Sequence, residues 1–76
     1  MPHAAKRASE AIRLRLNGVE ASTCAQTLDA LLAEQGYAGQ KVATAVNGTF
    51  IPERARAGQA LADGDHVEVV SARQGG

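Results

Sequence analysis

The clearest pattern in the chain is a strict alternation of apolar and charged residues that begins at Ile12. In residues 12–16, IRLRL, three branched apolar side chains share one face of an extended chain and two arginines share the other. Asn17-Gly18 follows directly, and this pair favours the two-residue type I′ turn that joins antiparallel strands. The alternation resumes over residues 19–22, so the pattern predicts an N-terminal β-hairpin.

The period changes over residues 23–35, where leucines recur at spacings of three and four and mark one face of a helix. Two residues could start this helix. Thr23 with a glutamine three positions later fits a capping box, and Thr27 followed by an acidic residue fits a cap with a charged first turn. We favour Thr27, because Leu28 begins the apolar stripe. Gly36 is the expected stop, since a left-handed residue is wanted there.

The second half of the chain contains three shorter strand patterns separated by turn residues. They cover residues 42–46, 49–51 and 66–71. The first is rich in β-branched and small residues and suits a position inside a sheet. The second ends at Pro52, which has no amide hydrogen, so this piece should lie at an edge or in a turn. Residues 53–62 show no regular period and are expected to be irregular, and residues 63–65, DGD, predict a turn.

The order of hairpin, helix, short strands and last strand indicates an α+β fold, in which one main helix packs on one face of a mixed sheet of four to five strands. The β-grasp (ubiquitin-like) fold has this order, although composition alone would not distinguish it from half of a ferredoxin-like fold. The first and last strands should lie parallel at the sheet centre, because the crossover between them is far longer than a hairpin needs. We expect a flexible N-terminal extension over 1–11, a domain over 12–72 and a flexible C-terminal tail over 73–76.

Length and composition limit what such a domain can do. The chain has 76 residues and is 45% hydrophobic, but 16 residues are alanine, so the core must be thin. One cysteine cannot form an internal disulfide, and two histidines show no metal-ligand spacing. A formal net charge of zero argues against nucleic-acid binding. No run approaches the roughly 20 apolar residues that span a bilayer, and no signal peptide is evident, so we expect a cytoplasmic protein without a membrane partner.

The last two residues, Gly75 and Gly76, have two interpretations. They could be the end of a solvated tail without a function. Alternatively, two residues without side chains form a thin peptide that can thread a narrow channel and present an unshielded carboxylate. A carboxylate is a poor electrophile, so a partner would first have to convert it to a mixed anhydride before sulfur or nitrogen could attack it.

Several ordered motifs resemble one known family. They are the turn at residues 16–18, the helix segment 26–32 (QTLDALL), the run 45–52 (AVNGTFIP), the run 61–70 (LADGDHVEVV) and the final Gly75-Gly76. Together they closely resemble the ThiS-type sulfur carrier proteins of thiamine thiazole biosynthesis, over residues 12–76. The chain departs from the usual pattern in its 11-residue N-terminal segment and in Glu53, where family members often have arginine.

The resemblance implies a carrier protein and not an enzyme, with no bound cofactor and no metal. A ubiquitin-activating-like adenylyltransferase would consume ATP to adenylate the carboxylate of Gly76, with Gly75 and Gly76 threading into its active site. A sulfur donor, such as a cysteine desulfurase or a similar enzyme, would then supply the sulfur of a thiocarboxylate. The acceptor implied by the family is the thiazole synthase, after which the carrier returns with an ordinary carboxylate.

Other candidate residues are weighed against plainer roles. Phe50 and Ile51 are expected in the core, or else in an apolar patch that meets the activating enzyme. Arg73 could contribute, with Arg54 and Arg56, to a docking rim, although scattered arginines are usually just solvated. A surface or hydrogen-bonded imidazole is favoured for His66 over a catalytic base.

Cys24 could relay sulfur, but no base neighbours it in the sequence, and a small semi-buried filler is the favoured interpretation.

Two other functions remain open from the sequence. The chain could be the small subunit of molybdopterin synthase, which donates sulfur to the molybdenum cofactor in a similar way, although the approach to the diglycine, residues 70–73 (VSAR), favours the thiazole pathway. It could also be a ubiquitin-like interaction module whose glycines are incidental. An independent enzyme has the least support, because no nucleophile, base and orienting group occur at credible spacing.

Overall fold

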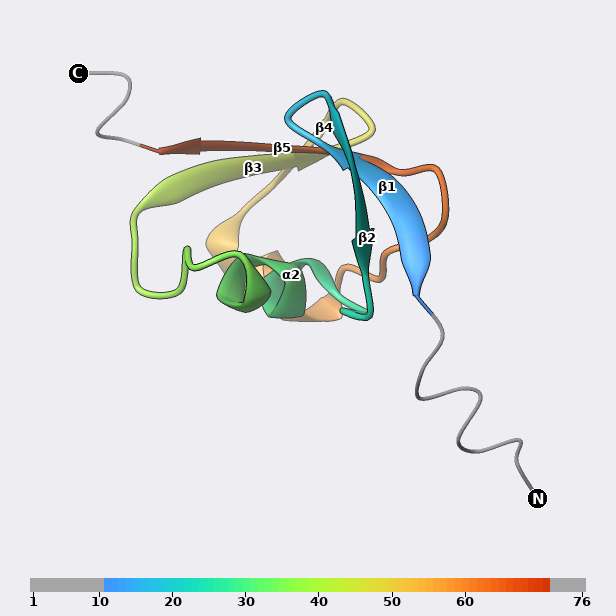
Figure 1. The fold of residues 1–76 in the computed structure, drawn as a ribbon. Coiled ribbons are helices and arrows are strands. Elements are labelled where there is room, and N and C mark those ends of the chain that lie inside the picture. Colours follow the sequence, from blue (N-terminus) through green and yellow to red (C-terminus); the bar gives the residue numbers. More distant parts are fainter. Residues whose placement is uncertain (1–10, 72–76) are drawn as a thin grey trace.

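The computed structural model describes residues 11–71 and shows a five-stranded mixed sheet with one α-helix below it (Figure 1). In chain order the elements are β1 (Ile12–Leu16), β2 (Val19–Thr23), α2 (Leu28–Glu34), β3 (Val42–Val46), β4 (Thr49–Ile51), the 3₁₀ helix η1 (Glu53–Gly58) and β5 (His66–Ser71). The predicted α+β class is confirmed. The predicted boundaries at residues 1–11 and 73–76 fall mostly outside the described residues and stay predictions.

The N-terminal hairpin forms as the alternation predicted. β1 and β2 pair antiparallel from Ile12 with Thr23 to Leu16 with Val19. Asn17 and Gly18 both have positive φ, 53° and 83°, which is the signature of a type I′ turn.

Both ends of α2 follow the capping rules. The Thr27 hydroxyl accepts a hydrogen bond from the Ala30 amide at 3.2 Å, which confirms Thr27 over Thr23 as the cap. At the other end, Gly36 has φ +87° and the Tyr37 amide donates to the Leu32 carbonyl at 2.8 Å. This is the Schellman pattern that stops a helix.

The strand order is β2-β1-β5-β3-β4. β1 and β5 run parallel, with Leu16 opposite Val67, and both lie inside the sheet. β3 also lies inside, between β5 and β4, while β4 is an edge strand that ends just before Pro52. The parallel central pair confirms the prediction for β1 and β5, and the positions of β3 and β4 agree with what their residues suggest. Together the strands make the β-grasp arrangement.

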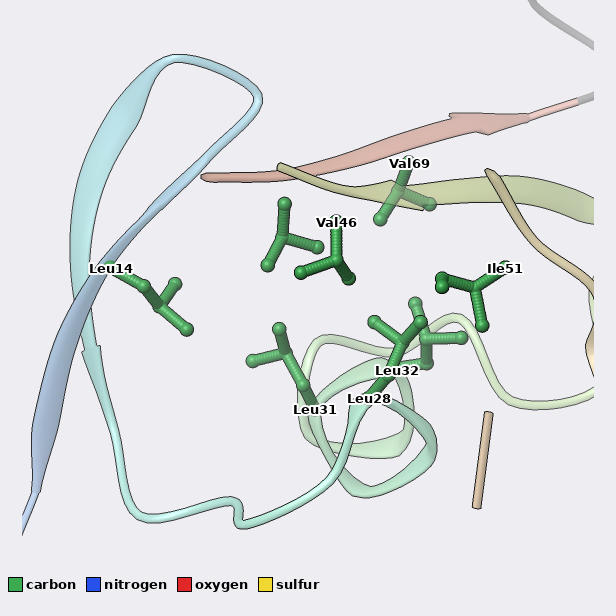
Figure 2. Packing of buried hydrophobic residues seen from close by; sticks show 8 residues of the cluster. Leu14, Leu28, Leu31, Leu32, Val46, Ile51 and Val69 are labelled. Atoms are coloured by element: carbon green, nitrogen blue, oxygen red, sulfur yellow. The ribbon is translucent and has the colours of Figure 1, made fainter. Parts of the chain in front are cut away.

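A small core fills the space between the sheet and α2 (Figure 2). The helix contributes three leucines, and the strands contribute five residues from the sheet face that points toward it. The buried apolar residues are Leu14, Leu28, Leu31, Leu32, Val46, Ile51, Val67 and Val69. The number of large side chains is small, in keeping with the alanine-rich composition.

The segment after Pro52 corrects two expectations. Residues Glu53–Gly58 form a 3₁₀ helix where the sequence indicated irregular chain, with the Ala55 amide bonded to the Pro52 carbonyl at 2.9 Å. A 3₁₀ helix has three residues per turn, so it leaves no 3.6-residue apolar period in the sequence. Arg56, expected at the surface, is only 8% exposed. Its Nε donates to Thr44 Oγ1 at 3.1 Å and its Nη2 to the Val42 carbonyl at 2.7 Å.

Candidate functional site

The C-terminal segment starts from strand β5, which lies between two neighbours in the middle of the sheet. Ser71 is the last residue of β5 and pairs with Val42, the first residue of β3. Five residues follow Ser71 in the sequence. Among them are Arg73, Gly75 and Gly76, which lie outside the described residues, so the roles predicted for them stay predictions.

The start of β5 is held by an asparagine turn. The Asn47 amide donates to the His66 carbonyl at 2.7 Å, and the Asn47 side-chain oxygen accepts from the His66 amide at 2.9 Å. The side-chain nitrogen of Asn47 donates to Asp65 at 3.0 Å. These three bonds fix where the last strand begins, and the pairing with β3 then fixes its course.

The sheet face that points away from α2 carries an apolar patch over β5, β3 and β4. Val70 lies opposite Ala43, and Ala45 lies between Phe50 and the exposed Glu68, so these four apolar residues share one surface with one carboxylate beside them. Val70 is 54% exposed and Phe50 is 64% exposed. We call these residues, Ala43, Ala45, Phe50 and Val70, the apolar sheet patch. An exposed apolar cluster of this kind commonly marks a protein contact.

Phe50 and Ile51, which the sequence suggests as core residues or as one apolar patch, lie on opposite sides of β4. Ile51 lies on the helix-facing side of β4 and is 7% exposed, so its core role is confirmed and no surface contact is available to it. Phe50, its neighbour, points to the opposite side, and the core role expected for it is wrong. Strand alternation places Ala43 and Ala45 on one face of β3 and Val70 on one face of β5, but the register between the strands is needed to bring them to the same surface as Phe50.

The other half of the same sheet face is polar. A surface hollow of about 530 Å³ is lined there by side chains that include Arg13, Arg15, Glu20 and His66. Arg13 and Glu20 form an exposed ion pair at 3.9 Å. His66 is exposed, in agreement with the surface imidazole favoured from the sequence.

Cys24 is exposed, so the semi-buried position expected for it is wrong. It follows the last residue of β2, Thr23, whose side chain takes the inward position and is 4% exposed. The Thr23 hydroxyl accepts from the Ala25 amide at 2.9 Å and donates to the Glu34 carboxylate.

Of the three arginines that the sequence suggests for a docking rim, Arg54 and Arg56 lie in the described part of the chain, and Arg73 does not. Arg54 is exposed, whereas Arg56 is buried against β3 and is not available to a partner. Within residues 11–71 no group of three or more His, Cys, Asp or Glu side chains is placed to hold a metal ion. In that same part of the chain no helix has the length and apolar character to cross a membrane.

Comparison with known proteins gives two findings. The model of the ThiS family matches residues 10–76. The crystal structure of a thiamine biosynthesis protein (ThiS) from Geobacter metallireducens superposes with a TM-score of 0.66 at 26% identity, over 79% of this chain and 93% of that one. No curated protein sequence matches the chain. The family match covers nearly the whole sequence and confirms the resemblance seen in its motifs, so the chain belongs to the ThiS family.

Proposed function

We propose that this protein is a sulfur carrier of thiamine biosynthesis and that the carboxylate of Gly76 is the group that carries the sulfur. The observation that supports this most is the family match, which extends through residue 76 and so includes Gly75 and Gly76. The solved relative is itself a thiamine biosynthesis protein, which favours the thiazole pathway over molybdenum cofactor synthesis.

The proposed chemistry requires activation by a partner. A ubiquitin-activating-like adenylyltransferase joins a Gly76 carboxylate oxygen to the α-phosphate of ATP, and pyrophosphate leaves. Sulfur at the sulfide level then attacks the acyl carbon, a C–S bond forms and AMP leaves with the oxygen. If the donor is the persulfide of a cysteine desulfurase, its terminal sulfur attacks the acyl carbon and forms an acyl disulfide as AMP leaves. A thiol then attacks the desulfurase sulfur of that S–S bond, so that a disulfide forms between the thiol and the desulfurase cysteine and the thiocarboxylate is released. A thiazole synthase is the proposed acceptor, and the cytoplasm is the proposed compartment.

The fold suits this role because β5 is held in the sheet and the proposed reacting carboxylate belongs to a residue five positions after the end of that strand. Ser71 is paired with Val42 of β3, and the five residues after it can span at most about 18 Å when extended. The apolar sheet patch lies on the same strand, at Val70, next to this point. A partner that contacts the patch therefore has the chain end within reach of a nearby active site.

The test is the intact mass of the protein after incubation with ATP, a ThiS-activating enzyme and a sulfur donor. We expect the mass to rise by the difference between one sulfur and one oxygen atom, and the rise to depend on ATP. A control without ATP separates this product from sulfur added to the Cys24 thiol, which needs no adenylate. An unchanged mass with an enzyme that loads a known ThiS protein would overturn the proposal.

Cys24→Ser should leave the rate of thiocarboxylate formation within about twofold of the original protein. The thiol is exposed and lies at the end of β2, which is an edge strand separated from β5 by β1, and the proposed chemistry does not use it. The measurement is the time course of the mass change for both proteins under the same conditions. A loss of tenfold or more would instead assign Cys24 a role in sulfur relay.

A further inference from the structure

The part of β5 nearest the C-terminal segment extends beyond β1. β1 is in register with β5 only as far as Leu16 opposite Val67, whereas β3 accompanies β5 to Val42 opposite Ser71. On the far side of β3, the register with β4 ends at Thr44 opposite Ile51. The chain end is therefore carried by a two-stranded ribbon, and isolated two-stranded ribbons are marginally stable.

On the β3 edge of the ribbon, Arg56 takes the place of a strand. β4 cannot continue because Pro52 follows it. The Val42 carbonyl accepts a hydrogen bond from Arg56 instead, at 2.7 Å. The Thr44 hydroxyl, which accepts from the same guanidinium, donates to the Ile51 carbonyl at 2.7 Å. This edge is thus closed by a buried side chain.

On the β5 edge of the ribbon, the side chain of Asn17 makes the contact that Arg56 makes on the β3 edge. The Asn17 amide donates to the Val67 carbonyl at 2.8 Å and so continues the parallel pairing of β1 by one step. The chain then turns away, because Asn17 has φ 53° and begins the turn into β2. The next donor of β5, the Val69 amide, is bonded at 2.8 Å to the side-chain oxygen of Asn17. The Asn17 side chain therefore provides the acceptor that a continuing strand β1 would otherwise provide.

We propose that Asn17 is a positioning residue, which holds β5 at Val69 and so sets the direction in which the C-terminal segment leaves the domain. This inference rests on the proposed function, because direction matters only if the chain end must reach a partner's active site. Reaction rates are sensitive to such placement, and a misplacement of about 1 Å can cost roughly 100-fold. Asn17 acts through β5 and is not proposed to touch a reacting atom.

The experiment compares Asn17→Gly with Asn47→Gly. Both positions are the first residue of an Asn-Gly turn with φ near 50°, and glycine tolerates that conformation. Each change removes a side-chain acceptor for a β5 amide, Val69 near the chain end in one case and His66 at the strand start in the other. Asn17→Asp keeps an acceptor oxygen and the tolerance of positive φ, so it is the conservative variant.

The measured quantities are kcat and KM for adenylation by a ThiS-activating enzyme, with the carrier as varied substrate, and amide hydrogen exchange by NMR. We expect Asn17→Gly to lower kcat about fivefold or more with KM within twofold, and to raise the exchange rate at Val69 at least tenfold. Asn47→Gly should leave kcat within twofold, and Asn17→Asp should restore kcat.

The outcomes separate the two proposals. If the unchanged carrier is adenylated and the two glycine variants have equal kcat, the positioning role is wrong while the carrier function stands. Equal kcat together with faster exchange at Val69 would make Asn17 structural only, and would also overturn the positioning role. If the unchanged carrier is not adenylated by an enzyme that accepts a known ThiS protein, the proposed function fails and the positioning role fails with it.

Discussion

Deleting Gly76 is expected to lower the rate of ATP-dependent sulfur loading at least 100-fold, and adding one glycine after Gly76 is expected to do the same. Each change moves the carboxylate by one residue, about 3.6 Å along an extended chain. Acyl adenylation requires the carboxylate oxygen to lie within about 3.5 Å of phosphorus in line with the leaving group, so a shift of this size removes the reactive geometry. The measurement is the initial rate of mass gain under the conditions that load the unchanged protein.

The matched control adds one glycine before Pro2, which gives the same composition as the C-terminal addition. Sulfur loading of this variant should be unchanged. Thermal unfolding of all three variants should stay within about 2 °C of the original, because the buried core residues lie between Leu14 and Val69. Loading of the C-terminally extended protein at the original rate would contradict the proposed role of Gly76.

The sequence predicts most of this fold because the deciding signals are local. Alternation over residues 12–16, the Asn-Gly pair and the change to a helical period each follow from a few adjacent residues, and the structure confirms each one. The cap at Thr27 and the stop at Gly36 also depend only on neighbouring backbone groups. The parallel pairing of β1 with β5 needed one further rule, the length of the crossover.

Local signals do not reach side chains whose partners come from distant parts of the chain, such as Arg56 and Asn17. The positive charge of Arg56 predicts exposure. However, Thr44 and the Val42 carbonyl, 12 and 14 residues away, accept hydrogen bonds from the guanidinium and so offset the free-energy cost of burying it. The pair Asn17-Gly18 predicts a turn at Asn17. Its second role depends on Val69, 52 residues later, and nothing in the sequence near Asn17 signals it.

At the candidate site, too, local sequence predicts some features and contacts between distant segments decide the others. Alternation places Phe50 and Ile51 on opposite faces of β4, yet it does not say which face meets the helix. The register of β4 with β3 decides this, since Ile51 lies opposite the buried Thr44 and Phe50 opposite Ala45. Because Ala43 and Ala45 are small, Phe50 and Val70 stand out from the surface beside them. Phe50 is therefore the largest apolar side chain that this face offers to a partner.

Phe50→Asp is expected to weaken binding to the activating enzyme at least 30-fold. An aromatic residue at the centre of a contact commonly contributes about 2 kcal/mol or more, and a carboxylate in its place would lose its water without gaining a partner. The domain should remain folded, because Phe50 is 64% exposed and contributes little to the core. The measurement is the dissociation constant by titration calorimetry, with thermal unfolding recorded for each variant.

Val19→Asp is the matched control for this prediction. Val19 is as exposed as Phe50, at 66%, and also lies on an edge strand, but it is paired with Leu16 and so belongs to the helix-facing side of the sheet, beside the β1–β2 turn. The same change there alters net charge equally and also removes an exposed apolar side chain, so binding should stay within about threefold. If both variants weaken binding to the same extent, the effect is one of charge and the apolar sheet patch is not the contact. If neither does, the enzyme must hold the carrier by its C-terminal segment or by another face.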